Sequence, residues 1–344
     1  MYCCKVERRE GERVRRYLLE RGLLNRDYKI KREGNFLYIP LVDKLEPILE
    51  EDLRSLVGSV EFLELEEEEF QRRRSGKKQM SFRDYLLSNF KKEIEKGLIS
   101  LSYDVIGSIV ILQISEEVDE DIRREIGKNA LRLIPSVKTV FRKKGGIEGD
   151  YRIRKLELLA GEYNTLTLYK ENSYRLWVDV EKVYFSPRLG WERKRIMEMV
   201  SPKDVVVDMF CGVGPFSIAC RRAKRVYSID INPYAIELLK KNIELNRVKD
   251  KIVPIWDDVR NVEVSGNRVI MNLPKYSHKF IDKALDIVED GGIIHYYTIA
   301  KDFKGAERVF ESRCDYEVLG RRVVKSYAPR EYVIVLDVKV NKSI

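Results

Sequence analysis

The chain reads VVVDMFCGVGPF from Val205 to Phe216. The apolar run that ends at Asp208 is typical of a buried strand, and the glycines that follow predict a turn that opens into a helix. Because glycines allow a backbone to approach a ligand closely, this strand–turn–helix unit indicates a nucleotide-binding site in an α/β domain. Taken alone, the unit suits a dinucleotide equally well.

The ends of two later strands narrow the choice of cofactor. The apolar run at 226–229 ends in Asp230, sixteen residues after Gly214, where a carboxylate can hold a ribose diol. The run at 269–271 is followed by Asn272-Leu273-Pro274, which places an amide and a rigid turn where a planar nitrogen substrate would dock. Together the three motifs predict S-adenosylmethionine as the cofactor and methyl transfer as the reaction.

Further residues near these strand ends are candidates for the same site. Ile231 is expected to flank the adenine, and Asp258, which follows a strand at 252–255, is expected to accept from the adenine amino group. Asp257 and Asp258 would also serve as a pair of helix N-caps. Tyr276 either stacks on a base or is an ordinary core aromatic.

The fold class expected for the chain is α/β. From about residue 173, strands alternate with helices, which predicts the doubly wound, mostly parallel sheet of a class I methyltransferase. Its strands are expected near 204–208, 225–229, 252–255, 268–271 and 292–298, with an edge hairpin at 323–327 and 332–338. We expect a small N-terminal α/β domain at 1–66, a charged linker at 67–78, a middle α+β domain at 79–172 and the cofactor domain at 173–344. Within the middle domain we expect a strand at 99–103 and a basic loop at 142–146.

Composition restricts the class of protein. The 344 residues carry a net charge of +9, and 35% of them are charged, which suits an anionic polymer such as nucleic acid as partner. A merely basic protein is the alternative. Five cysteines form no CxxC pair and there are two histidines, so we expect reduced thiols, a cytoplasmic location and no metal site. No leader and no apolar run of about 18 residues is visible, so we expect no membrane span.

Two polar segments supply candidates for proton transfer and for nucleic-acid binding. The segment 184–193 runs into the first helix of the cofactor domain, so Glu192 is expected over the mouth of the cofactor pocket as a general base. The alternative is a capped helix start with a solvated carboxylate. Basic side chains beside this domain are predicted to contact phosphates and bases, with a solvated basic face as the alternative; they are Lys143, Lys144, Arg152, Arg154 and Arg188.

Extended segments of the chain resemble one known family. YKIKREGNFLYIP at 28–40, GLISLSYDV at 97–105, KVYFSPRLG at 182–190 and KSYAPREY at 325–332 are similar to the archaeal tRNA guanosine methyltransferases that act on N1 of guanosine 37. The resemblance implies a first domain that docks on the outer corner of tRNA, and two further domains that enclose a flipped guanosine and S-adenosylmethionine. It implies that Arg152 contacts the guanine, that Glu192 is the general base, and that Asn272 fixes the base. As N1 loses its proton, negative charge spreads onto O6, and we expect Arg152 to stabilise that charge.

The resemblance also implies that the cofactor site is lined by Tyr184, Arg193, Phe210, Asp230, Ile231, Asp258, Val259 and Pro274. From the motifs themselves we add Gly212 and Gly214 of the glycine turn, and Asn272. The family suggests a monomer. Three alternatives stay open on the sequence: an aminocarboxypropyl transferase of the wyosine pathway, a methyltransferase that also acts on a wyosine intermediate, and a non-catalytic tRNA-binding protein. The last would be expected to lose the glycine turn or Asp230, and both are present.

Overall fold

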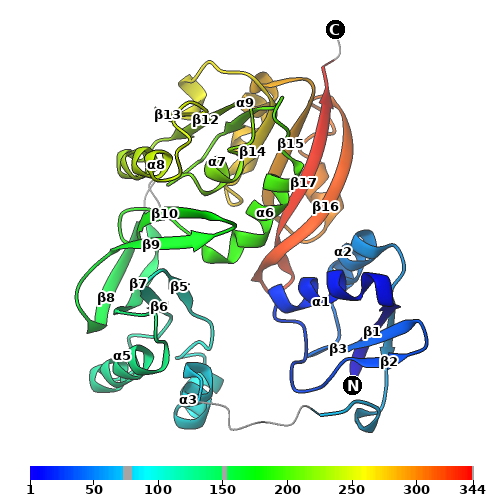
Figure 1. Cartoon of the computed structure of the whole chain (residues 1–344), viewed down its shortest axis with the longest axis vertical. Helices are drawn as coiled ribbons and strands as arrows, with labels where there is room; N and C mark the ends of the chain where they lie inside the picture. Colours follow the sequence, from blue (N-terminus) through cyan, green and yellow to red (C-terminus); the bar gives the residue numbers. More distant parts are fainter. Residues whose placement is uncertain (73–79, 149–152, 343–344) are drawn as a thin grey trace.

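A computed structural model describes residues 1–72, 80–148 and 153–342 of the chain (Figure 1). The described residues form three sheets of four or more strands and a separate two-stranded hairpin. In Figure 1 the largest sheet and its helices occupy the upper part of the view, while the N-terminal unit, in blue, and the middle unit, in cyan and green, lie below it.

The N-terminal unit is a small antiparallel sheet with two helices. The strand order is β2-β3-β1-β4, with β1 (Tyr2–Glu7) in the interior between β3 (Phe36–Pro40) and β4 (Glu61–Glu64). The remaining elements are β2 (Lys31–Glu33), α1 (Gly11–Glu20) and α2 (Pro47–Val57). The acidic residues after β4 fold back on this unit, because Glu69 pairs with Lys31 on β2 at 2.7 Å. Residues 73–78 of the predicted linker lie outside the described residues.

The middle unit is a four-stranded sheet, ordered β5-β6-β7-β8. Its elements are α3 (Phe82–Asn89), α4 (Lys91–Glu95), β5 (Asp104–Ile106), β6 (Ile109–Leu112), α5 (Glu120–Leu133), β7 (Thr139–Glu148) and β8 (Ile153–Gly161). The predicted strand at 99–103 is wrong: Ile99 makes a single bridge to Ile114, and the strand begins at Asp104.

The predicted basic loop at 142–146 is also wrong, because β7 continues through it to Glu148 and pairs with β8. Arg142 is buried, and its guanidinium pairs across the ladder with Glu157 at 2.7 Å, so its charge is satisfied within the sheet. The register shifts between Lys144 and Ile147, where Gly145 adopts a φ of 73°. Glycine tolerates this left-handed conformation, so the strand can bulge without ending.

A hairpin joins the middle unit to the large sheet. It consists of β9 (Leu166–Glu171) and β10 (Tyr174–Asp179), turning at Asn172 and Ser173, both with positive φ. Asn242 on α8 (Pro233–Leu245) fixes it to the large unit, since its side chain accepts from the backbone N–H of Trp177 at 2.6 Å and donates to the Trp177 carbonyl at 3.1 Å.

The large sheet confirms the predicted fold class. Its order is β13-β12-β11-β14-β15-β17-β16; β11 to β15 are parallel, and β17 pairs antiparallel with both β15 and β16. The chain order reverses between β11 and β14, and ligands of open α/β sheets bind at such a switch point. The strands are β11 (Val205–Asp208), β12 (Arg225–Asp230), β13 (Ile252–Trp256), β14 (Gly266–Met271), β15 (Val288–Ala300), β16 (Asp315–Ala328) and β17 (Glu331–Asn341).

Helices cover the sheet and position the site. They are α6 (Gly190–Met199), α7 (Pro215–Ala219), α8, α9 (Ile281–Ile287) and α10 (Phe303–Glu307), with 3-10 turns η3 (Pro187–Leu189), η4 (Val259–Asn261) and η5 (Ser277–Phe280). Across the described residues, no helix is long and apolar enough to cross a bilayer.

The N-terminal unit packs against the β16–β17 hairpin (Figure 1). Arg21, just after α1, donates to the carbonyl of Val323 on β16 and lies over the ring of Trp191 on α6, 4.6 Å from its centroid. Asp52 on α2 is buried and accepts from Tyr17 at 2.8 Å. The contact between the N-terminal unit and the large sheet therefore includes polar and aromatic partners. One of them is Trp191, the residue directly before Glu192.

Candidate cofactor and catalytic site

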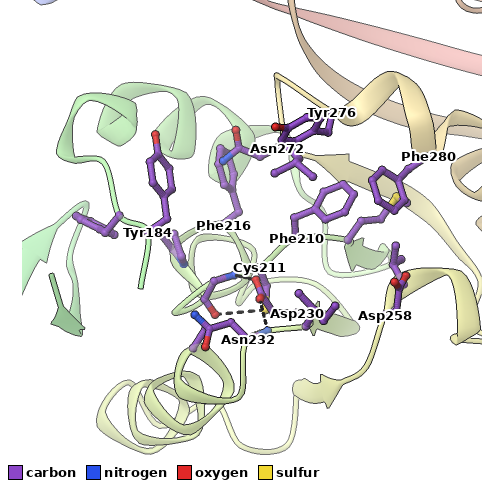
Figure 2. Close-up of a pocket in the computed structure, with 18 of the residues that line it drawn as sticks. Tyr184, Phe210, Cys211, Phe216, Asp230, Asn232, Asp258, Asn272, Tyr276 and Phe280 are labelled. Atoms are coloured by element: carbon purple, nitrogen blue, oxygen red, sulfur yellow. Dashed lines mark hydrogen bonds between the residues drawn. The ribbon is translucent and has the colours of Figure 1, made fainter. Parts of the chain in front are cut away.

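A cavity of about 650 Å³ opens at the carboxyl ends of β11, β12 and β14. Figure 2 shows its wall, with Tyr184 and Phe216 on one side, Phe210, Phe280 and Asp258 on the other, and Asp230 at the base. Of the predicted cofactor residues, the lining includes Tyr184, Arg193, Phe210, Gly212, Asp230, Ile231, Asp258, Val259 and Asn272. Neither Gly214 nor Pro274 belongs to the described lining.

The glycine turn after β11 is required by backbone geometry. Gly212 and Gly214 have φ values of 53° and 84°, a region that side chains rarely adopt. A Cβ on Gly214 would also lie 2.3 Å from the Leu239 Cδ1 atom on α8. Gly214 therefore shapes the turn and allows α8 to pack closely, while Gly212 contributes to the cavity wall.

Asp230 closes β12 and is held by the backbone of two loops. One carboxylate oxygen accepts from the Gly212 N–H at 2.7 Å, and the other accepts from the Asn232 N–H at 2.9 Å (Figure 2). These bonds fix the carboxylate against the glycine turn, at the base of the cavity. Carboxylate oxygens have further lone pairs, so a diol in the cavity can still donate to them.

Asp208 lies behind this carboxylate and is fully buried. Its Oδ2 accepts from the Ser217 hydroxyl at 2.7 Å, and its Oδ1 has no hydrogen-bond partner within the described residues. Burial, together with the nearby charge of Asp230, raises the pKa of Asp208 to about 7. The sequence identified this residue as a strand end and gave no indication of the shifted pKa.

Asp258, which follows β13, is both a capping residue and a residue of the cavity wall. Its carboxylate caps η4 by accepting from the Arg260 N–H at 2.9 Å, and it also lines the cavity. A hydrogen bond from the Arg260 guanidinium lowers the pKa of Asp258. Trp256, at the end of β13, is 65% exposed and donates from Nε1–H to the Ile231 carbonyl at 3.1 Å, but it is not among the described lining residues.

Asn272, Leu273 and Tyr276 line the cavity after β14. Tyr276 is 38% exposed, so it is not an ordinary core aromatic. Phe280 was missed from the sequence; its ring meets that of Phe210 edge to face, with centroids 5.0 Å apart. The sequence shows Phe280 as an apolar residue after the polar His278 and Lys279. This pattern indicates a buried side chain, but it does not distinguish a cavity wall from the core.

Arg193 lines the cavity, but its guanidinium is already occupied. It forms a two-pronged ion pair with Glu171 on β9, with an Nη2–Oε2 distance of 2.6 Å, and donates to the Ser186 carbonyl at 3.1 Å. Burial acts to lower the pKa of Arg193, but the carboxylate of Glu171 outweighs it and raises the pKa. Arg193 therefore fixes the cavity wall to the β9–β10 hairpin.

The prediction that Glu192 lies over the mouth of the pocket is wrong for this conformation. Glu192 is 0% exposed and is absent from the described cavity lining, which includes Leu189 and Arg193 from the same segment. The Glu192 side chain is turned toward partners on α6 and β15 instead. Its carboxylate accepts from Arg195 at 2.7 and 2.9 Å and from the Tyr297 hydroxyl at 2.6 Å.

Three of the predicted nucleic-acid contacts are described by the structure, and each of the three basic side chains lies near a carboxylate. Arg188 and Lys143 approach each other through Asp104 on β5, which accepts from Arg188 Nε at 2.8 Å and lies 3.8 Å from Lys143 Nζ. Lys144 lies 3.8 Å from Glu157. Arg152 and the side chain of Arg154 lie outside the described residues.

Three family models match successive parts of the chain. The tRNA methyltransferase 5 N-terminal domain matches residues 3–50, the TYW2 N-terminal domain matches residues 82–165, and the TRM5/TYW2 methyltransferase domain matches residues 167–319. The third range includes every described residue of the cavity wall.

Full-length relatives agree with these matches. The chain is 61% identical over 340 residues to the tRNA (guanine(37)-N(1))-methyltransferase Trm5b of Methanocaldococcus jannaschii, covering 99% of both chains. It is similar to the crystal structure of Methanocaldococcus jannaschii Trm5 in complex with adenosine, with 58% identity, a TM-score of 0.85 and complete coverage of both chains. It is also similar to the complex structure of aTrm5 and tRNALeu, with 60% identity, a TM-score of 0.75, and coverage of 99% of this chain and 100% of that one.

Proposed function

The chain belongs to the Trm5 family of tRNA (guanine(37)-N(1))-methyltransferases, and on that premise we propose that it methylates N1 of guanosine 37 in tRNA. S-adenosylmethionine is the methyl donor and 1-methylguanosine the product. The observation that carries the proposal is the end-to-end similarity to an enzyme named for this reaction, across 99% of both chains.

The cavity suits S-adenosylmethionine in size and in chemistry. Its volume of about 650 Å³ falls in the range of small-molecule sites. Asp230 offers carboxylate oxygens to the ribose diol, Ile231 offers an apolar face to the adenine, and Asp258 offers an acceptor to the adenine amino group. The chain-reversal point between β11 and β14 is also where a parallel sheet places such a ligand.

Methyl transfer to guanine N1 requires that a proton leave this nitrogen. When bound, S-adenosylmethionine supplies an electrophilic methyl group. We assign Glu192 as the base that accepts the N1 proton, Arg152 as the cation that stabilises negative charge developing on O6, and Asn272 as the residue that orients the ring. Asn272 supports this assignment by lining the cavity, while Glu192 must turn from its present partners before it can act.

From membership of the Trm5 family we also infer a role for each predicted domain. Residues 1–66 dock on the outer corner of tRNA, residues 67–78 link them to the rest, residues 79–172 contact tRNA near the target base, and residues 173–344 hold the cofactor. Lys143, Lys144, Arg154 and Arg188 contact the tRNA with Arg152. The location is cytoplasmic and the protein acts as a monomer, with no membrane partner.

Two unmodified tRNA transcripts that differ in G or A at position 37 test the proposal. Each is incubated with the enzyme and labelled S-adenosylmethionine, then digested for nucleoside mass analysis. We expect label in 1-methylguanosine with the G transcript and none with the A transcript. A mass gain that matches an aminocarboxypropyl group would assign the chain to the wyosine branch, and no label with either transcript would favour a binding protein.

A further inference from the structure

A continuous network of charged groups, each buried or nearly so, runs from Glu192 across neighbouring strands of the large sheet. It links α6 to β17, β15 and β14 and ends beside β11, outside the cavity. We call it the Glu192 network; its members, in order of contact, are Glu192, Arg195, Asp337, His295, Arg268 and Asp204. Burying charges is costly unless each one is paired, so a network of this length requires an explanation.

Glu192 cannot reach the cavity as it stands. Both carboxylate oxygens point at Arg195, and Oε2 also accepts from the Tyr297 hydroxyl. The ring of Tyr297 packs against Phe216, with centroids 5.7 Å apart, and Phe216 lines the cavity. One layer of aromatic side chains therefore stands between this carboxylate and the cavity.

Arg195 is shared between two carboxylates. Beside its two bonds to Glu192, it donates to Asp337 at 2.5 and 3.2 Å. A largely buried guanidinium with one carboxylate partner would be left unpaired if that partner moved, which is strongly unfavourable. With Asp337 in place, Glu192 can turn away while Arg195 keeps an ion pair.

His295 holds Asp337 in the orientation that this sharing needs. Arg268 Nη1 approaches His295 Nε2 at 2.8 Å, and because arginine can only donate, Nε2 must accept. The ring proton is then on Nδ1, which donates to Asp337 at 2.5 Å. Burial lowers the pKa of His295, in agreement with a neutral ring. Burial acts to raise the pKa of Asp337, but His295 and Arg195 outweigh it and lower that pKa.

We propose that Arg195 and Asp337 are positioning residues for Glu192. Arg195, with Tyr297, holds the carboxylate away from the cavity in the tRNA-free enzyme, and Asp337 retains Arg195 when Glu192 turns toward the guanine. The inference rests on the proposed function, in which Glu192 is the base. Neither Arg195 nor Asp337 touches the substrate; both act by setting the free energy for moving Glu192.

Single-turnover methyl transfer to the G37 transcript, with enzyme in excess, tests this inference. Asp337→Asn leaves Glu192 as the sole carboxylate on Arg195, so we expect the rate constant to fall by about tenfold, the effect of one charge-assisted hydrogen bond. The concentrations of tRNA and cofactor that give half the maximal rate should not change. Asp204→Asn is the matched control, since it removes a buried carboxylate from the other end of the network and should leave the rate within about twofold.

Tyr297→Phe separates positioning from a structural role. It removes one donor to Glu192 and leaves every charge in place, so alone it should not slow the reaction, and added to Asp337→Asn it should restore most of the lost rate. A purely structural network predicts that the double variant is slower than either single one. A wild-type rate for Asp337→Asn, or a double variant slower than Asp337→Asn, would overturn the inference.

The same assay on Glu192→Gln separates the role of Glu192 as base from the positioning role of Arg195 and Asp337. If Glu192→Gln is inactive and Asp337→Asn is fully active, Glu192 stands as the base and the positioning role fails. If Glu192→Gln keeps the wild-type rate, the base assignment fails and the positioning role fails with it.

Discussion

Asp208→Asn should change how the stability of the enzyme depends on pH. The native carboxyl is fully buried, and its pKa is raised from an ordinary value of 3.8 to about 7, mainly by burial and secondarily by Asp230. In the unfolded chain the group is solvated and titrates near its ordinary value. Between these two values the folded state keeps a proton that the unfolded state has lost.

The sign and size follow from linkage. The folded state binds the extra proton between about pH 4 and pH 7, so the free energy of unfolding decreases as pH rises through this window. Each pKa unit corresponds to about 1.4 kcal/mol, so a shift of about three units contributes on the order of 4 kcal/mol below pH 4, and this is lost above pH 7. From pH 5 to pH 8 the loss is on the order of 3 kcal/mol.

Guanidinium denaturation of the cofactor-free enzyme measures this effect. Trp177, Trp191 and Trp256 all lie within residues 167–319, so their fluorescence reports on the large unit. Asparagine cannot ionise, so Asp208→Asn should gain stability relative to wild type by on the order of 3 kcal/mol from pH 5 to pH 8. Asp257→Asn, at an exposed carboxylate, is the control and should show no such trend. A difference between wild type and Asp208→Asn that is the same at both pH values would refute the reasoning.

Three further substitutions test the roles assigned to the site. Asp230→Asn replaces a carboxylate held by two backbone N–H groups at 2.7 and 2.9 Å, so affinity for S-adenosylmethionine should fall about 10- to 100-fold in equilibrium binding while tRNA affinity is kept; unchanged cofactor affinity would contradict its role. Glu192→Gln should slow single-turnover transfer by about 10²-fold or more without weakening tRNA binding; equal losses in rate and binding would remove it as the base. Arg152→Ala should cost about 10²- to 10³-fold in rate, and a near-normal rate would exclude its action on O6.

The large sheet could be predicted because its sequence signals are local. Continuous apolar runs such as that at Val205 are typical of strands buried on both faces, and each run ends in polar or glycine residues that mark the carboxyl end. Asp230 and Asn272 therefore lie at the same edge of the sheet as expected. The same logic failed at Arg142, because a charged side chain in a strand depends on a partner from another strand, here Glu157.

The conformation of Glu192 could not be predicted for a related reason. Its position on α6 was evident, but the direction of its carboxylate depends on Arg195, Tyr297 and Asp337, and the last two lie more than one hundred residues away. Phe280 was missed because an aromatic residue at a helix end gives the same sequence pattern in a core and in a cavity wall. Tertiary contacts, absent from a single sequence, decide these cases.

The central claim, that the methyl group is added to N1 of guanosine 37, is tested most directly by reverse transcription across position 37. A G37 transcript is treated with the enzyme and unlabelled S-adenosylmethionine and then copied with a labelled primer that anneals on the 3′ side. A methyl group on N1 replaces the proton used in base pairing, so we predict a strong stop immediately before position 37 that requires both enzyme and cofactor. Full read-through of a transcript that mass analysis shows to be methylated would place the methyl group elsewhere and contradict the account.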